Sequence, residues 1–301
     1  MNGINGIIPP MVTPLLDDNQ LDHKGLEKLI EHILSGGVHG LFILGTTGEG
    51  PSLKYSVRVE LIERVCKLVD GRVPVLAGIM DSSLKESVYI ANIAKDAGVQ
   101  AVVAAPPYFF PVSKAELAGY FNQLLSEVPL PVYLYNQPTL TKMTLDVPLV
   151  RELLKRPKVI GFKDSSGDMT YFQKIKSLVR EHNIPLLCGP EELLAESLFA
   201  GGNGGISGGA NVFPALYVDI FDAMATGNFK KAVKLNEIVF LVSKILYSSG
   251  DYGSGGVING IKSALAHFGI LQSDHVVSPL SSSCPFTPEQ LELLQSTVNN
   301  R

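Results

Sequence analysis

Residues Val159-Ile-Gly-Phe-Lys-Asp-Ser-Ser-Gly-Asp168 form an apolar stretch that runs directly into a lysine and then into a polar loop. This pattern predicts a buried strand with Lys163 at its carboxyl end. An ammonium group at that place loses solvation, which favours the neutral amine, and a neutral amine is the nucleophile that attacks a ketone. The alternative is a lysine that reaches water or pairs with Asp164 or Asp168, as strand-end lysines usually do.

Seven further short apolar stretches can form strands of the same kind. Some begin at a glycine, as in Gly98-Val-Gln-Ala-Val-Val-Ala104, and others at an apolar residue followed by proline, as in Leu130-Pro-Val-Tyr-Leu-Tyr135. The remaining stretches are residues 6–13, 37–43, 73–78, 184–189 and 201–207. Eight buried parallel strands that alternate with helices predict a (β/α)₈ TIM barrel, closed by about residue 225. An open doubly wound sheet is the alternative, but no Gly-x-Gly-x-x-Gly motif follows the first strand.

The predicted helices carry start and stop signals. Asp22 opens a helix whose apolar positions between Leu26 and Leu34 follow helical spacing, and Gly36-Gly37 ends it. Ser83-Leu-Lys-Glu86 and Ser113-Lys-Ala-Glu116 are predicted capping boxes, and each precedes an apolar helical face.

The chain changes character from Asn228 onward. Two helical patterns, Phe229 to Tyr247 and Val257 to Phe268, flank the glycine-rich stretch Ser248 to Gly256. We expect residues 1–225 to form the barrel that carries the active site. Residues 226–301 should form a C-terminal helical appendage packed on the barrel, because no linker composition separates the two parts.

Composition excludes several classes of protein. The net charge of -4 and the absence of runs of lysine or arginine argue against a nucleic-acid partner. The apolar runs are too short to span a membrane, and the first residues lack the pattern of a signal peptide. Three distant cysteines, Cys66, Cys188 and Cys284, indicate reduced thiols in the cytoplasm. Without clustered metal-ligand residues, we expect no metal ion and no cofactor.

The chemistry of a (β/α)₈ barrel lies at the carboxyl ends of its strands. The second strand leads into Gly45-Thr-Thr-Gly-Glu-Gly-Pro-Ser52, whose amide and hydroxyl groups can converge on a carboxylate. The same loop could instead be a turn in which Thr47 or Ser52 caps the next helix. Tyr135 ends the strand next to that of Lys163, where its phenol could relay protons to a carbinolamine unless it is a core aromatic residue.

Three motifs together resemble one enzyme family. Gly45-Thr-Thr-Gly-Glu49, Tyr135-Asn-Gln-Pro138 and Gly161-Phe-Lys-Asp164 have the order and spacing of the dihydrodipicolinate synthase and N-acetylneuraminate lyase family. These are class I, pyruvate-dependent aldolases and lyases, and the similarity runs from about residue 6 into the C-terminal helices. The resemblance implies Lys163 as the Schiff-base lysine, Tyr135 as the proton shuttle and Thr46 as its relay partner.

The resemblance also implies the binding partners and the assembly. Thr47 and the amide of Gly48 would hold the carboxylate of pyruvate, which reacts with an aldehyde as second substrate. Ser165, Gly189 and Ile206, at the ends of the sixth, seventh and eighth strands, are further candidate substrate contacts. The family implies a homotetramer built as a dimer of dimers.

Departures from the family pattern bear on the choice of substrate. Synthases that use aspartate semialdehyde carry an arginine where this chain has Leu140, and no guanidinium is then available for a second carboxylate. Several lyases of the family have an apolar residue there, and they carry a run similar to Ser165-Ser-Gly-Asp168. Glu191 and Glu192 could accept hydrogen bonds from sugar hydroxyls, or could equally favour the dipole of the helix at residues 193–199.

A second departure concerns the proton relay. The family often supplies a tyrosine from a neighbouring subunit, and Phe109 occupies that position here. Either Tyr108 or water replaces it, or the Thr46 relay is cut short and the reaction depends less on it. We expect a lyase or aldolase that joins or separates pyruvate and an aldehyde, with a 2-keto-3-deoxy sugar acid or a sialic-acid-like compound as the favoured substrate. The alternatives are a keto-deoxy acid dehydratase, a 4-hydroxy-tetrahydrodipicolinate synthase and a non-catalytic keto-acid sensor.

Overall fold

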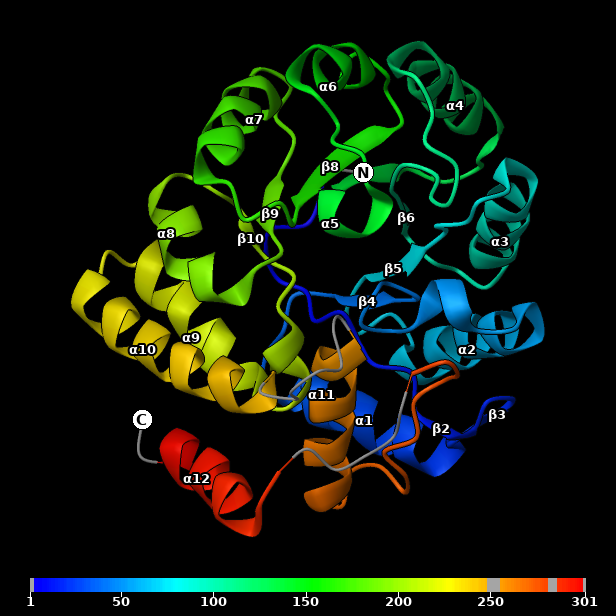
Figure 1. Cartoon of the computed structure of the whole chain (residues 1–301). Helices are drawn as coiled ribbons and strands as arrows, with labels where there is room; N and C mark the ends of the chain where they lie inside the picture. The colour runs from blue at the N-terminus through cyan, green and yellow to red at the C-terminus, as the bar shows by residue number, and fades with distance from the viewer. Residues whose placement is uncertain (1–2, 248–254, 281–285, 300–301) are drawn as a thin grey trace.

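A ring of parallel strands surrounded by helices dominates the computed structural model, which describes residues 3–247, 255–280 and 286–299 (Figure 1). Within these ranges, eight parallel strands follow one another in the order β1, β10, β9, β8, β7, β6, β5 and β4. They are β1 (Gly6–Ile7), β4 (Leu41–Ile43), β5 (Val75–Gly78), β6 (Ala101–Ala104), β7 (Val132–Asn136), β8 (Val159–Asp164), β9 (Leu186–Cys188) and β10 (Gly204–Gly205).

Hydrogen bonds between the chain after β1 and the strand β4 close the ring. The Phe42 N–H donates to the Pro9 carbonyl at 3.0 Å, and the Met11 N–H donates to the Phe42 carbonyl at 2.8 Å. Pro10 and Phe42 thus form a parallel bridge. The predicted (β/α)₈ barrel is confirmed, and the open doubly wound sheet is not what forms.

Side chains fill the barrel, so that it is a packed core and not a pore. Phe42 on β4 and Tyr133 on β7 are fully buried in this interior. A Cβ atom at Gly161 of β8 would lie 2.0 Å from the Tyr133 ring, so only glycine leaves room for that ring. The Tyr133 hydroxyl accepts a hydrogen bond from the Ile4 N–H at 2.5 Å, which closes the amino-terminal end of the barrel.

Helices cover the outside of the ring because each presents an apolar face to the strands. The barrel helices are α1 (His23–Ser35), α2 (Tyr55–Val69), α3 (Leu84–Asp96), α4 (Lys114–Glu127), α6 (Val147–Leu153), α7 (Met169–Glu181), α8 (Leu194–Phe199) and α9 (Pro214–Ala225), with the short α5 (Pro138–Thr141) above β7. Three 3₁₀ turns add η1 (Gly50–Ser52), η2 (Glu191–Leu193) and η3 (Gly208–Asn211). A small hairpin of β2 (Leu15–Asp17) and β3 (Gln20–Leu21) was not predicted from the sequence.

The predicted helix caps are confirmed except for one half of a capping box. The Asp22 carboxylate caps α1 by accepting from the Gly25 N–H at 2.8 Å, and Ser113 and Glu116 form the reciprocal box of α4. At α3, the Ser83 hydroxyl accepts from the Glu86 N–H, but the return bond is missing. Asp81 already accepts from the Ser83 N–H at 2.9 Å, which is the physical reason why the predicted box is one-sided.

The C-terminal region adds α10 (Phe229–Leu246), α11 (Gly255–His267) and α12 (Pro288–Asn299). Helix α10 packs along α9 and η2, α11 contacts α10 and η3, and α12 lies beside α10 (Figure 1). Helix α12 was not predicted. Most of the glycine-rich stretch predicted as a break, Ser248 to Ser254, lies outside the described residues, and its last two glycines begin α11.

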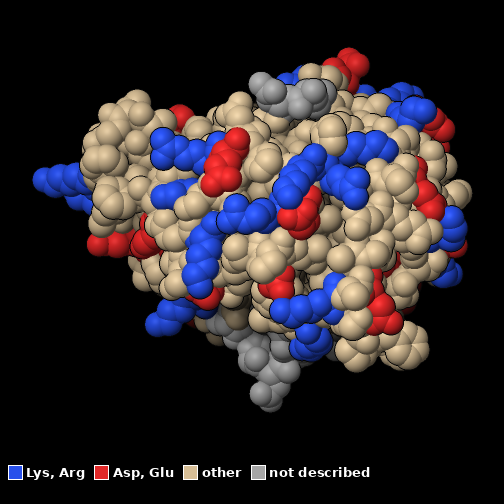
Figure 2. Space-filling view, turned by 90° about the horizontal axis from the view of Figure 1, so that it is seen from above, with Lys and Arg blue, Asp and Glu red and all other residues tan. Residues whose placement is uncertain are grey.

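The surface charge, the helices and the cysteines bear on location and on ligands. Basic and acidic side chains are interspersed on the face seen in Figure 2. None of the helices in the described ranges has the length and apolar character needed to cross a membrane. The same ranges hold no group of three or more His, Cys, Asp and Glu side chains placed to bind a metal ion. Cys66 and Cys188 are free thiols, and Cys284 lies outside the described residues.

Candidate active site

Lys163 and Tyr135 meet at the carboxyl end of the barrel. They are direct partners in the parallel register of β7 and β8, so their side chains point to the same side. The Lys163 side chain is buried, with 4% of the residue exposed. Its Nζ lies 4.1 Å from the centroid of the Tyr135 ring and 5.1 Å from that of Phe42. Lys163 therefore neither reaches bulk water nor forms an ion pair with Asp164.

Asp164 has its own set of partners, which explains why it does not pair with the lysine. Its carboxylate accepts from the Asn136 side chain at 2.9 Å and from the Ser166 hydroxyl at 2.9 Å. Burial raises the pKa of Asp164, and these hydrogen bonds oppose the shift. The carboxylate fixes the turn after β8 from outside the pocket.

The electrostatic surroundings of Tyr135 suit a proton shuttle. Burial alone would raise the pKa of this phenol, but the charge of Lys163 and hydrogen bonds from Thr46, Ser165 and Lys163 outweigh burial, so the pKa is lowered. A phenol whose pKa moves toward neutrality exchanges protons more readily with a reacting group. Tyr135 is thus a polar member of the site and not simply a core aromatic residue.

The loop after β4, residues 45–48, places two hydroxyl groups beside Lys163 and Tyr135. We term it the threonine loop. Thr46 and Thr47 line the pocket, whereas Gly48 is not among the lining residues. The Gly48 carbonyl accepts from the Thr13 hydroxyl at 2.6 Å, and a Cβ atom on Gly48 would lie 2.9 Å from the Met11 carbonyl oxygen. Gly48 therefore allows the loop to approach the first strand closely. The alternative of a helix cap does not hold, because α2 starts after Lys54 without a side-chain cap.

A cavity of about 260 Å³ opens above Lys163. Except for Gly48, every residue predicted for the site lines it, although the residues come from five strands and their loops. The predicted lining residues are Thr46, Thr47, Tyr135, Lys163, Ser165, Gly189, Glu191, Glu192 and Ile206. Sequence reasoning did not assign Gln137, Thr139, Tyr247 and Val257 to the site. They also line the cavity, together with Pro10, Leu140, Pro190, Gly208 and Ile258.

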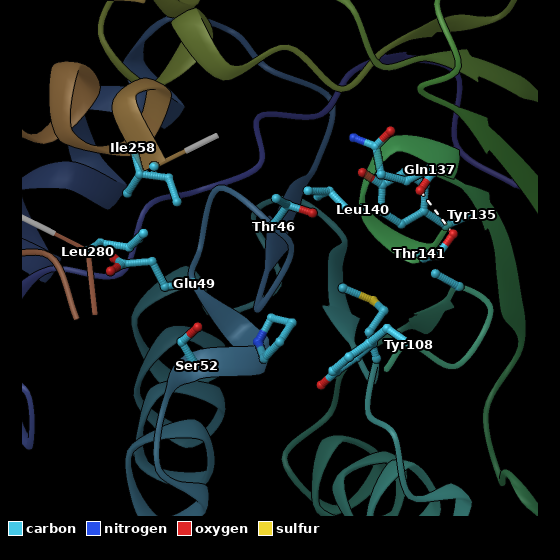
Figure 3. Close-up of a pocket in the computed structure, with 14 residues that line it drawn as sticks. Thr46, Glu49, Ser52, Tyr108, Tyr135, Gln137, Leu140, Thr141, Ile258 and Leu280 are labelled. Atoms are coloured by element: carbon cyan, nitrogen blue, oxygen red, sulfur yellow. Dashed lines mark hydrogen bonds between the residues drawn. The ribbon is translucent and has the colours of Figure 1, made fainter. Parts of the chain in front are cut away.

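A second cavity of similar size adjoins the first one (Figure 3). Thr46, Tyr135 and Leu140 belong to both, so the two form adjoining compartments. Met80, Tyr108, Ile258 and Leu280 make the second compartment largely apolar. In Figure 3, Ile258 and Leu280 face Tyr108 across this space, with Thr46 between them. Burial raises the pKa of Tyr108, which therefore stays a neutral phenol.

The Glu191 carboxylate is hydrogen-bonded to groups of the same chain. It is 3% exposed, and its carboxylate accepts from the Gly209 N–H and from the Tyr217 hydroxyl, both at 2.7 Å. Burial raises the pKa of Glu191 to about 7, with hydrogen bonds from Gly209, Tyr217 and Tyr247 acting in the opposite direction. These contacts make Glu191 an internal support of the loop after β10. Glu192, half-buried on the same turn, leaves its carboxylate more open to the cavity.

The two departures from the expected pattern lie in different places. Leu140 is on α5 at the mouth of the cavities, with 37% of the residue exposed. Phe109 is 84% exposed with a φ angle of 87°, and its ring contacts Phe110 edge to face at 4.9 Å. Phe109 does not line either cavity of its own chain. Its ring points away from the chain that carries it.

A (β/α)₈ barrel with a buried lysine, a tyrosine and a threonine gathered at the carboxyl ends of its strands defines a lysine-dependent carbon–carbon lyase. Comparison with known proteins agrees with this class. The model of the dihydrodipicolinate synthetase family matches residues 3–300, and this chain belongs to that family. Members of the family are class I pyruvate-dependent lyases and aldolases.

Relatives with two different activities are similar to this chain. A 4-hydroxy-tetrahydrodipicolinate synthase of Methanoculleus marisnigri is 35% identical over 77% of this chain and 80% of its own length. YagE of Escherichia coli K12, named provisionally as a 2-dehydro-3-deoxy-D-gluconate aldolase, is 33% identical over 92% of this chain and 91% of its own.

Solved structures show the same two kinds of relative. The dihydrodipicolinate synthase of Bacteroides thetaiotaomicron superposes with a TM-score of 0.91 at 43% identity, over the full length of both chains. YagE, whose crystal structure contains pyruvate, superposes with a TM-score of 0.87 at 31% identity, over 98% of each chain.

Proposed function

We propose that this protein is a lyase that separates, or joins, pyruvate and an uncharged hydroxylated aldehyde, with 2-keto-3-deoxy sugar acids as its substrates. One observation carries the proposal: Lys163 is the only cationic side chain among the residues described as lining the two cavities. A 2-keto-3-deoxy sugar acid has one carboxylate, and it lies on the pyruvate half. Such a substrate needs one seat for an anion, beside the lysine, and none for the aldehyde half.

The residues around Lys163 have complementary tasks in this reaction. Thr47 and the amides of its loop bind the carboxylate and place the keto carbon next to Nζ. The amine attacks that carbon, Tyr135 passes a proton to the new hydroxyl of the carbinolamine, and water leaves to give the imine. Tyr135 then takes the proton of the C4 hydroxyl as the bond between C3 and C4 breaks. The electron pair of that bond moves to the protonated imine and forms an enamine.

Three features support these roles. Burial raises the pKa of Tyr135, but the charge of Lys163 and hydrogen bonds outweigh burial and lower it, which makes the phenol a better proton donor. Thr46 hydrogen-bonds to this phenol and can orient it. YagE, whose structure holds pyruvate and whose assigned substrate is a sugar acid, is similar over nearly the whole chain.

The lining of the cavity around Lys163 offers groups for the aldehyde half. Gln137, Thr139 and Ser165 present amide and hydroxyl groups, and Glu192 presents a carboxylate that can accept from sugar hydroxyls. Gly189 and Ile206 shape the floor of the cavity. Glu191 contributes indirectly in this proposal, by holding the Gly209 amide.

Synthesis of 4-hydroxy-tetrahydrodipicolinate is the second candidate function. The 43% identity to the Bacteroides thetaiotaomicron synthase favours it. Against it stands Leu140, which places an apolar side chain at the cavity mouth where a second carboxylate would need a cation.

We also infer a homotetramer assembled through two apolar surfaces. The first is the exposed pair Phe109 and Phe110, which is 84% and 73% exposed. Phe109 also has a positive φ angle. Such a conformation costs on the order of 1–3 kcal/mol and occurs preferentially at functional sites. The second surface consists of Phe199, Phe229 and Val233 on α8 and α10, where Phe199 packs edge to face on Phe229 at 5.7 Å.

The location proposed for this tetramer is the cytoplasm. The free thiols of Cys66 and Cys188 support it, because a reducing compartment keeps such groups unpaired. Burial raises the pKa of the Cys66 thiol to about 11, so this group resists oxidation.

Trapping of the imine tests the proposed chemistry. Incubation with pyruvate and borohydride should add one reduced pyruvyl group, and peptide mapping should place it on Lys163. Lys163→Arg, which keeps a cation but cannot form the imine, is the control and should give no adduct. Release of pyruvate from a panel of 2-keto-3-deoxy acids then identifies the substrate. No adduct on the wild-type chain, or an adduct on another lysine, would overturn the lysine mechanism.

A further inference from the structure

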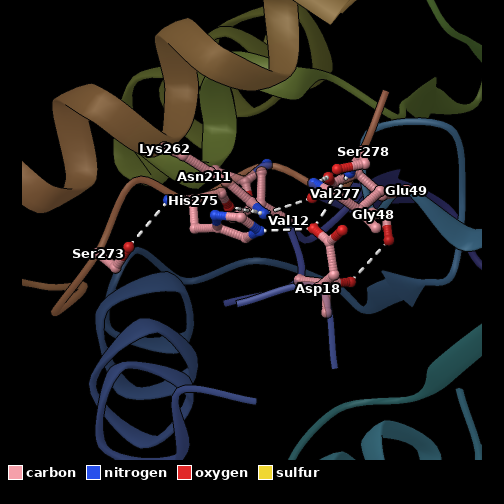
Figure 4. A network of polar contacts seen from close by, with 11 residues as sticks. Val12, Asp18, Gly48, Glu49, Asn211, Lys262, Ser273, His275, Val277 and Ser278 are labelled. Carbon is pink, nitrogen blue, oxygen red and sulfur yellow. Dashed lines mark hydrogen bonds and ion pairs between the residues drawn. The ribbon is translucent and has the colours of Figure 1, made fainter. Parts of the chain in front are cut away.

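The C-terminal region reaches the threonine loop through a buried ion pair. Lys262 on α11 contacts the carboxylate of Glu49, which follows the threonine loop, and both side chains are completely inaccessible to solvent. The two residues are far apart in the sequence, and neither belongs to the groups assigned to catalysis above. Figure 4 shows the pair within a network of polar contacts.

Each partner of the pair makes a further contact that ties it to the backbone. The second oxygen of Glu49 accepts from the Val277 N–H at 2.7 Å, and the Lys262 ammonium donates to the His275 carbonyl at 2.7 Å. Burial lowers the pKa of Lys262, and the charge of Glu49 opposes that shift. The pair therefore joins three separate parts of the chain: the threonine loop, α11 and the segment 271–280, which we term the C-terminal strap.

The C-terminal strap is held to the barrel at two more points. The His275 ring contacts the Asp18 carboxylate at 2.8 Å, and the Gln272 N–H donates to the Asp22 carboxylate at 2.8 Å. Gln272 and His275 thus attach the strap to the barrel on the N-terminal side of Val277. The Val277 N–H that donates to Glu49 therefore lies in a segment that two further contacts attach to the barrel.

Glu49 in turn fixes the backbone of the threonines. Its own φ angle of 56° lies in the left-handed region, which is strained for a residue with a side chain. The Glu49 N–H donates to the Thr46 carbonyl at 3.0 Å, and the Glu49 carbonyl accepts from the Ser52 N–H at 2.8 Å. The turn that presents Thr46 and Thr47 therefore closes on a residue whose conformation is held by its side chain.

Stability alone does not explain this pair. Replacing a buried ion pair by well-packed apolar residues is often neutral or stabilising, because burying two charges costs much of what their attraction returns. The two charges and the two backbone hydrogen bonds do, however, hold Glu49 and the threonine loop in one defined orientation. That orientation matters here because misplacement of a binding group by about 1 Å can cost on the order of 10²-fold in rate.

We propose that Glu49 and Lys262 are positioning residues, which hold Thr46 and Thr47 in the geometry that binds the keto acid. The C-terminal region is then a part of the active site's support and not only a cover for the barrel. This inference rests on the proposed function, since it assigns the threonine loop to the keto acid. Its structural part, the support of the loop by the pair, does not depend on the identity of the substrate.

The test compares Lys262→Met, Glu49→Gln and the double variant Glu49→Leu/Lys262→Met in the full chain. The double variant buries no unpaired charge and stays informative where a single variant fails to fold. We expect its kcat/KM for the keto acid to fall about 10- to 100-fold at 25 °C, with a raised KM. Lys163 should still be trapped with pyruvate. Glu49→Gln, which keeps an acceptor for Val277, should lose less.

Hydrogen exchange supplies a readout that needs no substrate. In the double variant, amides of residues 45–50 should exchange faster, while those of α7 should not change. Lys176→Met is the matched control, because Lys176 also donates to a carbonyl, that of Ala200, at the opposite end of the barrel. Lys176→Met should leave both kcat/KM and the hydrogen exchange of residues 45–50 unchanged.

A double variant with wild-type kcat/KM, or with unchanged exchange at residues 45–50, would overturn the positioning role. Failure of the wild-type chain to trap pyruvate would overturn the proposed function instead. The exchange measurement would still decide whether the pair supports the loop.

Discussion

Tyr135 and Lys163 are register partners on adjacent strands, and only 4.1 Å separates the amine nitrogen from the centre of the phenol ring. The relation is fixed by the sheet, because the backbone of β7 and β8 sets both Cα positions before any substrate binds. The sheet therefore places the amine and its nearest acid side by side. Because the backbone fixes both positions, one side chain can be replaced without moving the other, and the contribution of the phenol can be measured separately from that of the amine.

Removing the phenol should slow the reaction without preventing the imine. A positioned acid or base contributes typically about 10²–10⁴ in rate, so Tyr135→Phe should lose roughly that factor in kcat. Tyr133→Phe is the matched control, since Tyr133 lies two residues earlier on β7 and points into the same barrel interior. It should keep its kcat. Near wild-type kcat for Tyr135→Phe would remove this residue from the mechanism.

The relay beyond Tyr135 should matter less. Thr46 hydrogen-bonds to the phenol, and Phe109 carries no hydroxyl that could extend the chain of proton carriers. Thr46→Val should therefore lose less kcat than Tyr135→Phe. Phe109→Tyr should change kcat modestly or raise it. Steady-state rates on one confirmed substrate decide both, and a larger loss for Thr46→Val than for Tyr135→Phe would contradict this order.

The aldehyde specificity should depend on Leu140. We expect the wild-type chain to show no appreciable condensation of pyruvate with aspartate semialdehyde, because no cation faces a second carboxylate among the described residues at the cavity mouth. Leu140→Arg should leave trapping of pyruvate on Lys163 intact, and Leu140→Gln is the uncharged control of similar length. Robust condensation by the wild type, measured as consumption of both substrates, would show that the inference from Leu140 is wrong.

Stability should depend on pH through Glu191. Burial raises the pKa of this carboxyl to about 7 in the folded protein, against about 4.5 in an unfolded chain. Between these values the folded state binds more protons, so this contribution is complete below about pH 4.5 and is lost as the pH rises through 7. It amounts to about 3 kcal/mol.

Glu191→Gln should remove this dependence. Its free energy of unfolding, measured in urea from pH 5 to pH 8, should fall less with pH than that of the wild type. Glu196→Gln, at an exposed position on α8, is the control and should follow the wild-type slope. Parallel slopes for Glu191→Gln and the wild type would exclude the buried carboxyl as the source.

The apolar surface of α8 and α10 should hold two dimers together. Phe199→Glu with Phe229→Glu places two charges in a surface that is now apolar. Light scattering should then report dimers for this variant and the expected tetramer for the wild type. Leu293→Glu is the control, because Leu293 is 52% exposed on α12 and lies outside this surface. A wild-type chain that is monomeric at all concentrations would contradict the expected assembly.

Much of the barrel could be predicted because its signals are local. Each strand is a short apolar run with glycine or proline at or near its start, and each of these runs overlaps an observed strand of the ring, from β1 to β10. The hairpin of β2 and β3 was missed because polar residues 17–20 interrupt it, so that neither strand lies in an apolar run like those of the ring. Helix α12 was missed because the tail carries few apolar residues.

The site was predictable where motifs mark the strand ends. Motifs at the strand ends led to the prediction of Lys163, Tyr135, Thr46 and Thr47 as site residues. The structure places these four residues around one cavity. The partner of Glu49 was not predictable, because Lys262 comes from a distant helix. One signal was available, since Lys262 is the only charged residue in the apolar run from Val257 to Leu265. The contacts of Glu191 also needed the fold, as Tyr217 and Gly209 come from later elements.

The placement of Leu140 on α5 has an evolutionary consequence. The amine and phenol stand on β7 and β8, whose sequences are constrained by the packed barrel interior, whereas Leu140 stands on a helix of four residues outside the ring. We expect exchange of that short segment to alter which aldehyde is accepted while Lys163 and Tyr135 keep the bond chemistry unchanged. Under the proposed function, two barrels of this kind would differ in the aldehydes they accept through changes within Pro138–Thr141 alone.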